Sequence, residues 1–446
     1  MNQEATSGIS IDDESAYPSP ARAWGLVLLL TIAYAISFVD RQIISLLVGP
    51  IKADLGLSDF EISLLMGLAF GLFYTLMGIP LGRAADKYNR RNLIVAGMSL
   101  WCLMTAASGL ARNFFQLFLA RLGIAVGEAA LSPAALSMIS DSFPEEKRTG
   151  PIGFYNSAIY VGSGLAMILG GAIIHMATNS PPMNVPYFGE MAPWQTTFLI
   201  VGLPGLAVAL VIAFTREPTR KDLLRSADGG AAVLSFKDVV SYLWERKYIY
   251  APIFIGMAVV AIVNFMFLAW TPTLYERVHD WEIADIGYSY GIISLIFGPL
   301  GIFIGARLGN YFAAKDDHGG HAKAAFIGYL FMVPGMIMTP VISNPQLALV
   351  GLALIPFGMA FITVNMVTGL LRITPNQLRG QTYAMFLLAI SLTGTTLGPT
   401  LVGTITDFIF GNEMMVGYSM LTISLPTAFI AGIAFFKCIS AFRRFS

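Results

Sequence analysis

The sequence GRAADKYNRR, residues 82–91, is a short charged stretch between two long apolar runs. The run before it covers 59–82 and the run after it covers 91–112. Each is long enough to cross the hydrocarbon layer of a membrane, about 30 Å thick, as a helix. Strands of a membrane barrel would alternate between apolar and polar residues over about ten positions, and the sequence has no such alternation. The region around 82–91 therefore predicts a helical hairpin in a membrane.

The same pattern continues along the whole chain. Of its 446 residues, 56% are hydrophobic and only 12% are charged, whereas soluble domains carry roughly 25% charged residues. This charge is too little to cover a soluble fold, so we expect an all-α membrane protein. We predict twelve transmembrane helices in two sets of six, at 23–49, 59–82, 91–112, 114–141, 149–177 and 194–215, and at 248–276, 284–308, 322–343, 346–371, 379–407 and 414–438.

The charged interruptions suggest the domain organisation. An internal repeat supports two halves, because SFPEEKR at 142–148 follows the fourth helix and ITPNQLR at 373–379 follows the tenth. Two repeated halves with a site between them near the midplane are typical of secondary transporters. We expect a tail at 1–22, a first six-helix bundle at 23–215, a linker at 216–247, a second six-helix bundle at 248–440 and a tail at 441–446.

The lysines and arginines predict the orientation. If the N-terminus is inside the cell, the outer segments receive only Lys52, Arg112 and Arg277, and the cytoplasmic segments hold the other basic clusters. Both termini are therefore expected in the cytoplasm. The stretch 1–22 lacks the basic start and small-residue cleavage site of a signal peptide, so the first helix should be retained. Short loops favour a bacterial inner membrane.

Four charged residues lie well inside the apolar runs: Asp40 and Arg41 in the first helix, and Arg121 and Glu128 in the fourth. Each costs about 2.5–3.5 kcal/mol to insert, so such residues usually face a bundle interior or a watery cavity and pair with one another. One interpretation is a static salt bridge between the two helices. The interpretation we prefer is a site for proton coupling and for the substrate head group, in which Arg41 pairs with Glu128 and Asp40 gains and loses a proton.

The centres of the last six helices carry no charge, but they carry uncharged polar and aromatic side chains. Ordinary helix packing can explain any one of these side chains. Taken together, they predict a second cavity wall that suits the apolar tail of an amphiphile. The residues expected there are Asn264, Phe267, Thr271, Phe361, Thr363 and Thr368.

Other classes of function find no support in the sequence. There are four histidines and two cysteines, without a metal-ligand spacing, a nucleophile elbow or a Walker-type phosphate loop. Lysine plus arginine equals aspartate plus glutamate at 27 each, so no basic excess points to nucleic acid. We expect no enzyme activity, no cofactor and no metal, and a monomer whose partners are its substrate, protons and membrane lipid.

The stretch 82–91 resembles the loop 2–3 signature of the major facilitator superfamily, with Asn89 in place of a glycine. RLGIAVGEA at 121–129 is similar to the helix 4 pattern of that superfamily. FVDR at 38–41 and GEA at 127–129 resemble its Spinster branch, which is associated with export of sphingolipids, including sphingosine-1-phosphate, and of lysophospholipids. The resemblance implies alternating-access transport of such an amphiphile, coupled to protons. The alternative is proton-coupled or facilitative transport of another small organic anion or drug.

The resemblance also implies a cytoplasmic gate. In the superfamily, the aspartate of the loop signature contacts the start of helix 11, which places Asp86 near Arg379 when the cytoplasmic side is closed. We further expect Arg90 to pair with Asp141. A solvated charge cluster is the alternative explanation for this loop. The expected gate residues are Asp86, Lys87, Arg90, Arg91, Asp141 and Arg379.

Overall fold

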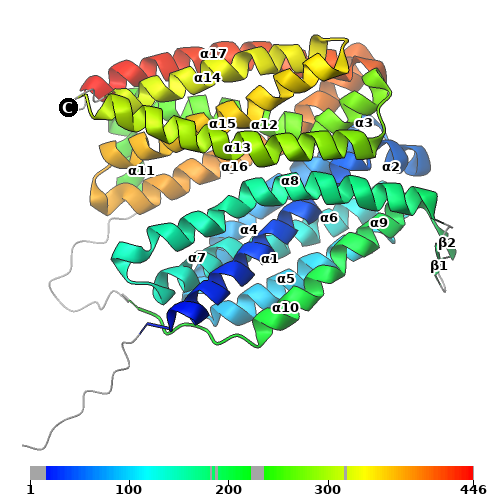
Figure 1. The fold of residues 1–446 in the computed structure, drawn as a ribbon, viewed down its shortest axis with the longest axis horizontal. Coiled ribbons are helices and arrows are strands. Elements are labelled where there is room, and N and C mark those ends of the chain that lie inside the picture. The colour runs from blue at the N-terminus through cyan, green and yellow to red at the C-terminus, as the bar shows by residue number, and fades with distance from the viewer. Residues whose placement is uncertain (1–16, 181–182, 186–188, 222–235, 316–318, 445–446) are drawn as a thin grey trace, which may run out of the picture.

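The computed structural model describes residues 17–180, 183–185, 189–221, 236–315 and 319–444 (Figure 1). The expected tail before Tyr17, the part of the expected linker at 222–235 and the last two residues lie outside this range.

The described chain forms two bundles of long helices, one below the other in Figure 1. The first bundle contains α1 (Pro20–Leu46), α2 (Val48–Leu55), α3 (Asp59–Met66), α4 (Leu68–Lys87), α5 (Arg90–Ser108), α6 (Phe114–Glu128), α7 (Leu131–Ser142), α8 (Thr149–Asn179), α9 (Pro193–Gly202) and α10 (Pro204–Ala213). The second contains α11 (Phe236–Glu245), α12 (Lys247–His279), α13 (Ile283–Ala313), α14 (Gly320–Val341), α15 (Pro345–Ile373), α16 (Asn376–Ile405) and α17 (Val416–Arg444).

The prediction of an all-helical membrane fold is confirmed. Eleven helical segments of the described chain are long and apolar enough to cross a membrane. The twelfth is α5, which has 19 residues and packs against α6, α9 and α10. Its first turn begins with Arg90 and Arg91, and these charges lower its hydrophobicity below that of the other spans. Several predicted spans are divided by short breaks.

The break in the predicted span 114–141 matters most for the site. This span divides into α6, which ends at Glu128, and α7, which begins at Leu131. Pro133 explains the interruption, because its nitrogen has no hydrogen to donate to the carbonyl group of Ala129, four residues earlier. Glu128 is therefore the last residue of a helix rather than the middle of one.

A β hairpin and the helix α11 were not expected from the sequence. An antiparallel hairpin of β1 (Met183–Val185) and β2 (Gly189–Met191) follows α8, and Gly189 has the positive φ of 78° that favours glycine. The helix α11 lies within the stretch predicted as linker. Its buried side chains Val239 and Leu243 are four residues apart, so they lie on one face of the helix, which packs against α12 and α16.

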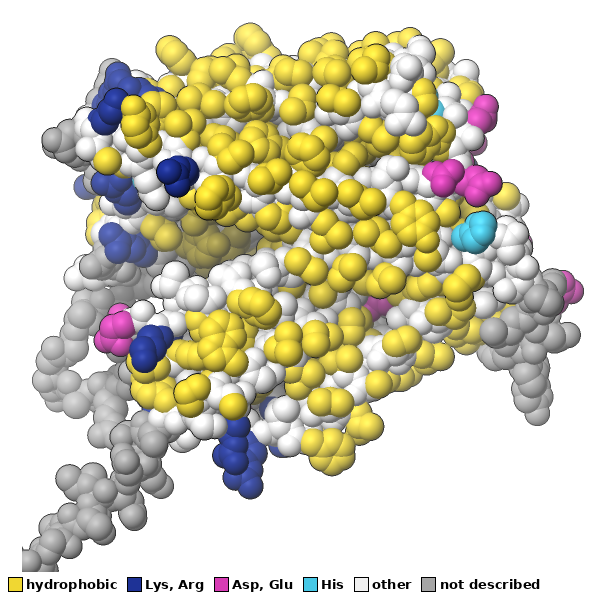
Figure 2. All heavy atoms as spheres, in the orientation of Figure 1, with side chains coloured by type: hydrophobic (Ala, Val, Ile, Leu, Met, Phe, Trp, Pro, Cys, Tyr) yellow, Lys and Arg dark blue, Asp and Glu magenta, His cyan; other side chains and the backbone are white. Residues whose placement is uncertain are grey.

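The two ends of the molecule can be named by what lies there. We call the end where α1 begins and α17 ends the terminal face. The opposite end, with the β hairpin, is the hairpin face (Figure 1). In Figure 2, lysine and arginine side chains gather toward the terminal face, and hydrophobic side chains cover the surface between the two ends. This distribution is typical of a protein whose apolar band lies in lipid.

The two bundles pack closely along α8 and α13. A Cβ atom on Gly164 of α8 would lie 2.9 Å from the carbonyl oxygen of Gly291 in α13, so only a residue without a side chain fits there. Nearer the terminal face the same helices expose Phe154 and Phe303, with 42% and 66% of their surface accessible. Figure 2 shows a recess between the bundles on that side. The bundles are therefore closed toward the hairpin face and separated toward the terminal face.

Candidate functional site

An ion pair joins the first and fourth spans at the centre of the first bundle. Nη2 of Arg41, on α1, lies 2.6 Å from Oε2 of Glu128, at the end of α6. The Glu128 side chain is 1% exposed and that of Arg41 is 13% exposed. The contact predicted between these two residues is present, and the second Glu128 oxygen, Oε1, has no hydrogen-bond partner in the part of the chain that the structure describes.

Three aromatic rings surround the Arg41 guanidinium. Its central carbon lies 4.4 Å from the ring centre of Phe70, 4.9 Å from that of Phe38 and 5.1 Å from that of Tyr74. Ring faces attract a cation, so these contacts hold the arginine in place where water is scarce. Its Nε has no hydrogen-bond partner among the residues described, which leaves this donor available.

Asp40 is fully buried on α1, and neither oxygen of its carboxylate has a hydrogen-bond partner among the described residues. Trp101 and Thr105 of α5 are the polar neighbours of this carboxylate. Nε1 of Trp101 and Oγ1 of Thr105 are buried without well-formed hydrogen bonds as well. A charged carboxylate without partners is costly in such surroundings. The site therefore holds a carboxyl group that forms no ion pair with the residues that the structure describes.

Arg121 is fully buried on α6, and it contacts main-chain groups rather than a carboxylate. Its Nη1 donates to the carbonyl oxygen of Asp40, and its Nε donates to that of Leu65, both at 3.3 Å. The Arg121 guanidinium thus links α6 to α1 and to the end of α3. Its Nη2 has no partner in the described chain.

A small pocket between the bundles opens beside Arg41. Its first wall includes Arg41, Met66 and Phe70 from the first bundle, and its second wall is formed mainly by α12 and α16 of the second bundle. The α12 side chains that line it are Phe265, Leu268 and Ala269, spaced three and four residues apart and so on one face of the helix.

The structure places several predicted wall residues elsewhere. Phe267 and Thr271 lie on another face of α12 and are fully buried. Phe361 is packed on Gly305 and Gly328, inside the second bundle. The remaining predicted residues do not line this pocket either: Asn264 is half-buried, and the hydroxyl groups of Thr363 and Thr368 donate to carbonyl groups of their own helix, α15.

The predicted gate residues form contacts within single bundles. Arg90 is fully buried and pairs with Asp141, as expected, while its Nε donates to Glu217 at 2.8 Å. Nη1 of Arg91 donates to the carbonyl oxygen of Thr215 at 3.0 Å. These contacts attach the loop at 82–91 to the chain that leaves α10.

The remaining gate residues are exposed on the terminal face. Asp86 accepts a hydrogen bond from Arg220 through its main-chain carbonyl group, and Lys87 lies over the ring of Tyr88. Nε of Arg379 donates to the carbonyl oxygen of Thr374, in its own bundle. Because the bundles are separated here, the pairing of Asp86 with Arg379 in a closed state stays a prediction.

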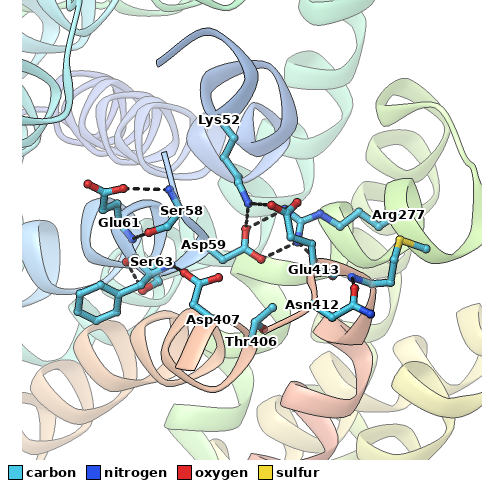
Figure 3. A network of polar contacts seen from close by, with 12 residues as sticks. Lys52, Ser58, Asp59, Glu61, Ser63, Arg277, Thr406, Asp407, Asn412 and Glu413 are labelled. Atoms are coloured by element: carbon cyan, nitrogen blue, oxygen red, sulfur yellow. Dashed lines mark hydrogen bonds and ion pairs between the residues drawn. The ribbon is translucent and has the colours of Figure 1, made fainter. Parts of the chain in front are cut away.

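A network of charges across the hairpin face was not predicted (Figure 3). Arg277 of α12 donates to both oxygens of the fully buried Asp59 at the start of α3, at 2.7 and 2.8 Å. Lys52 of α2 bridges Asp59 at 2.5 Å and Glu413 at 2.7 Å. Asp407 accepts the main-chain N–H of Phe60 at 2.6 Å. These contacts hold the two bundles together at this face.

One sequence signal could have found part of this network. Ser58 and Glu61 form a capping box, in which each side chain accepts a main-chain N–H of the other residue. The pattern marks a helix start at Asp59 and so places a carboxylate in its first turn. The sequence contains no comparable signal for the partner, Arg277.

Two helical bundles around a small pocket with buried charges on one wall define the architecture of a secondary transporter. The chain belongs to the Major Facilitator Superfamily, whose family model matches residues 30–399. It is similar to an MFS-type efflux pump of Mycolicibacterium smegmatis (strain ATCC 700084 / mc(2)155), with 26% identity over 442 residues, 97% of this chain and 96% of that protein. It is also similar to protein spinster homolog 1 of Xenopus tropicalis, with 26% identity over 402 residues, 86% of this chain and 73% of that protein.

A solved structure has the same fold. It is a bacterial homolog to the human lysosomal transporter Spinster in an inward-facing and unoccupied conformation, with a TM-score of 0.80 and 25% identity. The match covers 96% of this chain and 98% of that one. Spinster proteins are thus among the relatives of this superfamily member.

Proposed function

We propose that the chain is a proton-coupled transporter of an anionic amphiphile, such as a sphingolipid phosphate or a lysophospholipid. The observation that carries the proposal is the position of Arg41. Among the described residues that line the pocket, Arg41 is the charged one, and it lies opposite an apolar wall formed by Phe265, Leu268 and Ala269. Such a site suits a molecule with a charged head and an apolar tail.

Arg41 binds the head group in this proposal. A guanidinium can form two parallel hydrogen bonds with a phosphate or carboxylate group. At present Nη2 of Arg41 is paired with Glu128. A substrate anion and Glu128 therefore compete for the same cation, and protonation of Glu128 releases the arginine to the substrate.

Asp40 carries the transported proton in this proposal. It is adjacent to Arg41 in the chain and fully buried, and its carboxylate has no hydrogen-bond partner within the described ranges. Since a lone buried charge is costly, the carboxyl group keeps its proton while the site is closed and exchanges it when water enters. Proton binding at Asp40 and substrate binding at Arg41 are thus coupled through neighbouring residues of α1.

Alternating access follows from contacts that only one state can make. The pair of Asp59 with Arg277 fits the state closed at the hairpin face. The pair of Asp86 with Arg379 belongs to the opposite state. Each pair biases the equilibrium toward the state in which it forms.

We propose that the terminal face is cytoplasmic, in a bacterial inner membrane. The lysine and arginine side chains at that face support this orientation (Figure 2). The protein would act as a monomer, with the closed and open states related by movement of one bundle against the other.

The second candidate function is transport of another small organic anion or drug. The relative from Mycolicibacterium smegmatis, which is named an efflux pump, favours it. A sugar-like substrate would need polar partners on both walls, and among the described residues the second wall of the pocket supplies only Thr395. This wall favours an amphiphile over a sugar derivative.

Transport into proteoliposomes tests the proposal. Vesicles with an imposed pH gradient would be offered a labelled lysophospholipid, sphingosine-1-phosphate or a labelled sugar acid. We expect pH-driven movement of one of the lipids, its loss in Arg41→Ala, and no movement of the sugar acid. Lys437→Gln, an exposed change on α17, is the matched control. If only the sugar acid moved, the second candidate function would be supported and transport of an amphiphile would be contradicted.

A further inference from the structure

A groove at the terminal face of the first bundle lies apart from the site between the bundles. Three segments form it: the start of α1, the end of α7 and the stretch 215–221 that leaves α10. Its volume is about 560 Å³, within the range of small-molecule pockets, roughly 300–1,000 Å³. No step of the proposed transport cycle uses it.

Basic side chains line this groove. Arg22 on α1 and Arg216 after α10 are both exposed, and neither has a hydrogen-bond or ion-pair partner among the residues that the structure describes. Lys221 also lines the groove, with its Nζ 3.6 Å from the ring centre of Tyr17. The two arginines thus offer guanidinium groups to an anion.

The two carboxylates in the groove share one buried cation, and with Arg22, Arg216 and Lys221 counted, four cations face these two carboxylates. Asp141 and Glu217 both pair with the fully buried Arg90. Asp141 also accepts the main-chain N–H of Lys221 at 3.2 Å. These carboxylates therefore serve Arg90, and the groove keeps a positive balance on its open side.

The start of α1 adds to this positive character. The side chain of Ser19 does not cap the helix, and the first turn contains no acidic residue. Pro20 has no N–H and that of Ala23 donates to Ser19, so the N–H groups of Ala21 and Arg22 are left for an anion, which the helix dipole also favours. Gly25 lines the groove one turn further, and a Cβ atom there would meet nothing within 4 Å.

We propose that this groove binds a phosphate group, carried either by the head group of an anionic membrane lipid or by a soluble phosphate. Arg22 and Arg216 bind it from two sides and so link the start of α1 to the chain that leaves the first bundle. Pro18 and Leu26, which also line the groove, add apolar surface that suits the glycerol end of a phospholipid.

Binding of three probes to the purified full chain in uncharged detergent tests the proposal. The probes are short-chain phosphatidylglycerol, phosphatidylcholine with the same chains, and sodium phosphate. Native mass spectrometry and the midpoint of thermal unfolding would report their binding. We expect phosphatidylglycerol to bind more tightly than phosphatidylcholine. Arg22→Gln and Arg216→Gln should each weaken its binding about fivefold, because one cation near an anionic head group contributes about 1 kcal/mol. Lys437→Gln, an exposed change in the other bundle, should leave the binding unchanged.

Gly25→Leu tests whether the ligand lies inside the groove, because the leucine side chain fills the groove without changing its charge. The variant keeps both arginines and improves helix propensity, so the free protein should be no less stable than the wild type. It should weaken phosphatidylglycerol binding about tenfold by filling the groove. Binding of phosphatidylglycerol alone supports a lipid site, and additional binding of free phosphate supports a site open to solutes. Equal binding of phosphatidylcholine, or variants that bind as tightly as the wild type, would overturn the proposal.

Discussion

Arg277 of α12 donates to both carboxylate oxygens of Asp59 in α3, and these two hydrogen bonds connect the bundles at the hairpin face. The residues are 218 positions apart in the sequence. Asp59 is fully buried, and the Arg277 side chain is 11% exposed. A bidentate pair of this kind has a fixed geometry, so it forms in only one arrangement of the bundles.

Replacing Asp59 with asparagine should favour opening at the hairpin face. Removing one member of a buried pair costs about 3–5 kcal/mol, because the other charge loses its partner. Lys52 and Glu413 remain nearby, so we expect a smaller shift in the conformational equilibrium, about tenfold. Distances between spin labels at the exposed residues Glu190 and Leu347 would report it.

The chain is well suited to this measurement, because both native cysteines, Cys102 and Cys438, are buried. The control is Glu245→Gln, which removes the exposed pair with Arg246, 3.5 Å long. Such surface pairs contribute about 0–1 kcal/mol. If Asp59→Asn and the control gave the same distance distribution, the charge network would not hold this face closed.

Replacing Asp40 with asparagine should abolish pH-driven transport and leave the fold intact. The two side chains have the same shape, and asparagine stays neutral at every pH, as the protonated carboxyl group is in the closed site. We therefore expect a thermal midpoint equal to or above that of the wild type. Uptake under a pH gradient should fall to the level of empty vesicles, while exchange of substrate across the membrane without a gradient continues.

Asp54→Asn is a suitable control for this prediction. It also changes an aspartate in the first bundle, but Asp54 lies at the hairpin face, where it accepts a hydrogen bond from Trp194. It should transport as the wild type does. Retained pH-driven uptake in Asp40→Asn would assign the proton to another residue, and Glu128 would be the first to test.

Replacing Glu128 with glutamine should strengthen binding of the anionic substrate and weaken its dependence on pH. The change removes the charge that now occupies Arg41, 2.6 Å away. The head group then no longer competes with a carboxylate, so we expect about a tenfold tighter apparent affinity at neutral pH. Binding measured by substrate-induced thermal stabilisation at two pH values would check it. If Glu128→Gln bound the substrate only as tightly as the wild type does at both pH values, the pair of Arg41 and Glu128 would have only a structural role.

The sequence predicted the features that rest on local periodicity and on the cost of buried charge. Arg41 and Glu128 stand out because they interrupt apolar helices, and their pairing followed from the need to compensate them. The lining of the second wall was not predictable in the same way. Apart from Asn264, the residues around Phe265 and Phe267 are apolar or weakly polar, and Asn264 does not line the pocket, so no contrast in the sequence marks which face of α12 meets it. The pairing of Asp59 with Arg277 depends on how the two bundles dock, which no local pattern records.

Gly164 of α8 lies against Gly291 of α13, where the two bundles meet. Gly164→Ala should open the hairpin face, because the added Cβ atom would lie 2.9 Å from the Gly291 carbonyl oxygen and against the side chain of Leu295. A carbonyl group within a helix cannot move aside, and overpacking of this kind typically costs about 1–3 kcal/mol. Gly153→Ala is the control in the same helix, where a Cβ atom meets nothing within 4 Å. The same spin labels should show a longer distance at the hairpin face in Gly164→Ala only. Equal distributions in the two variants would mean that α8 and α13 do not determine how closely the bundles approach.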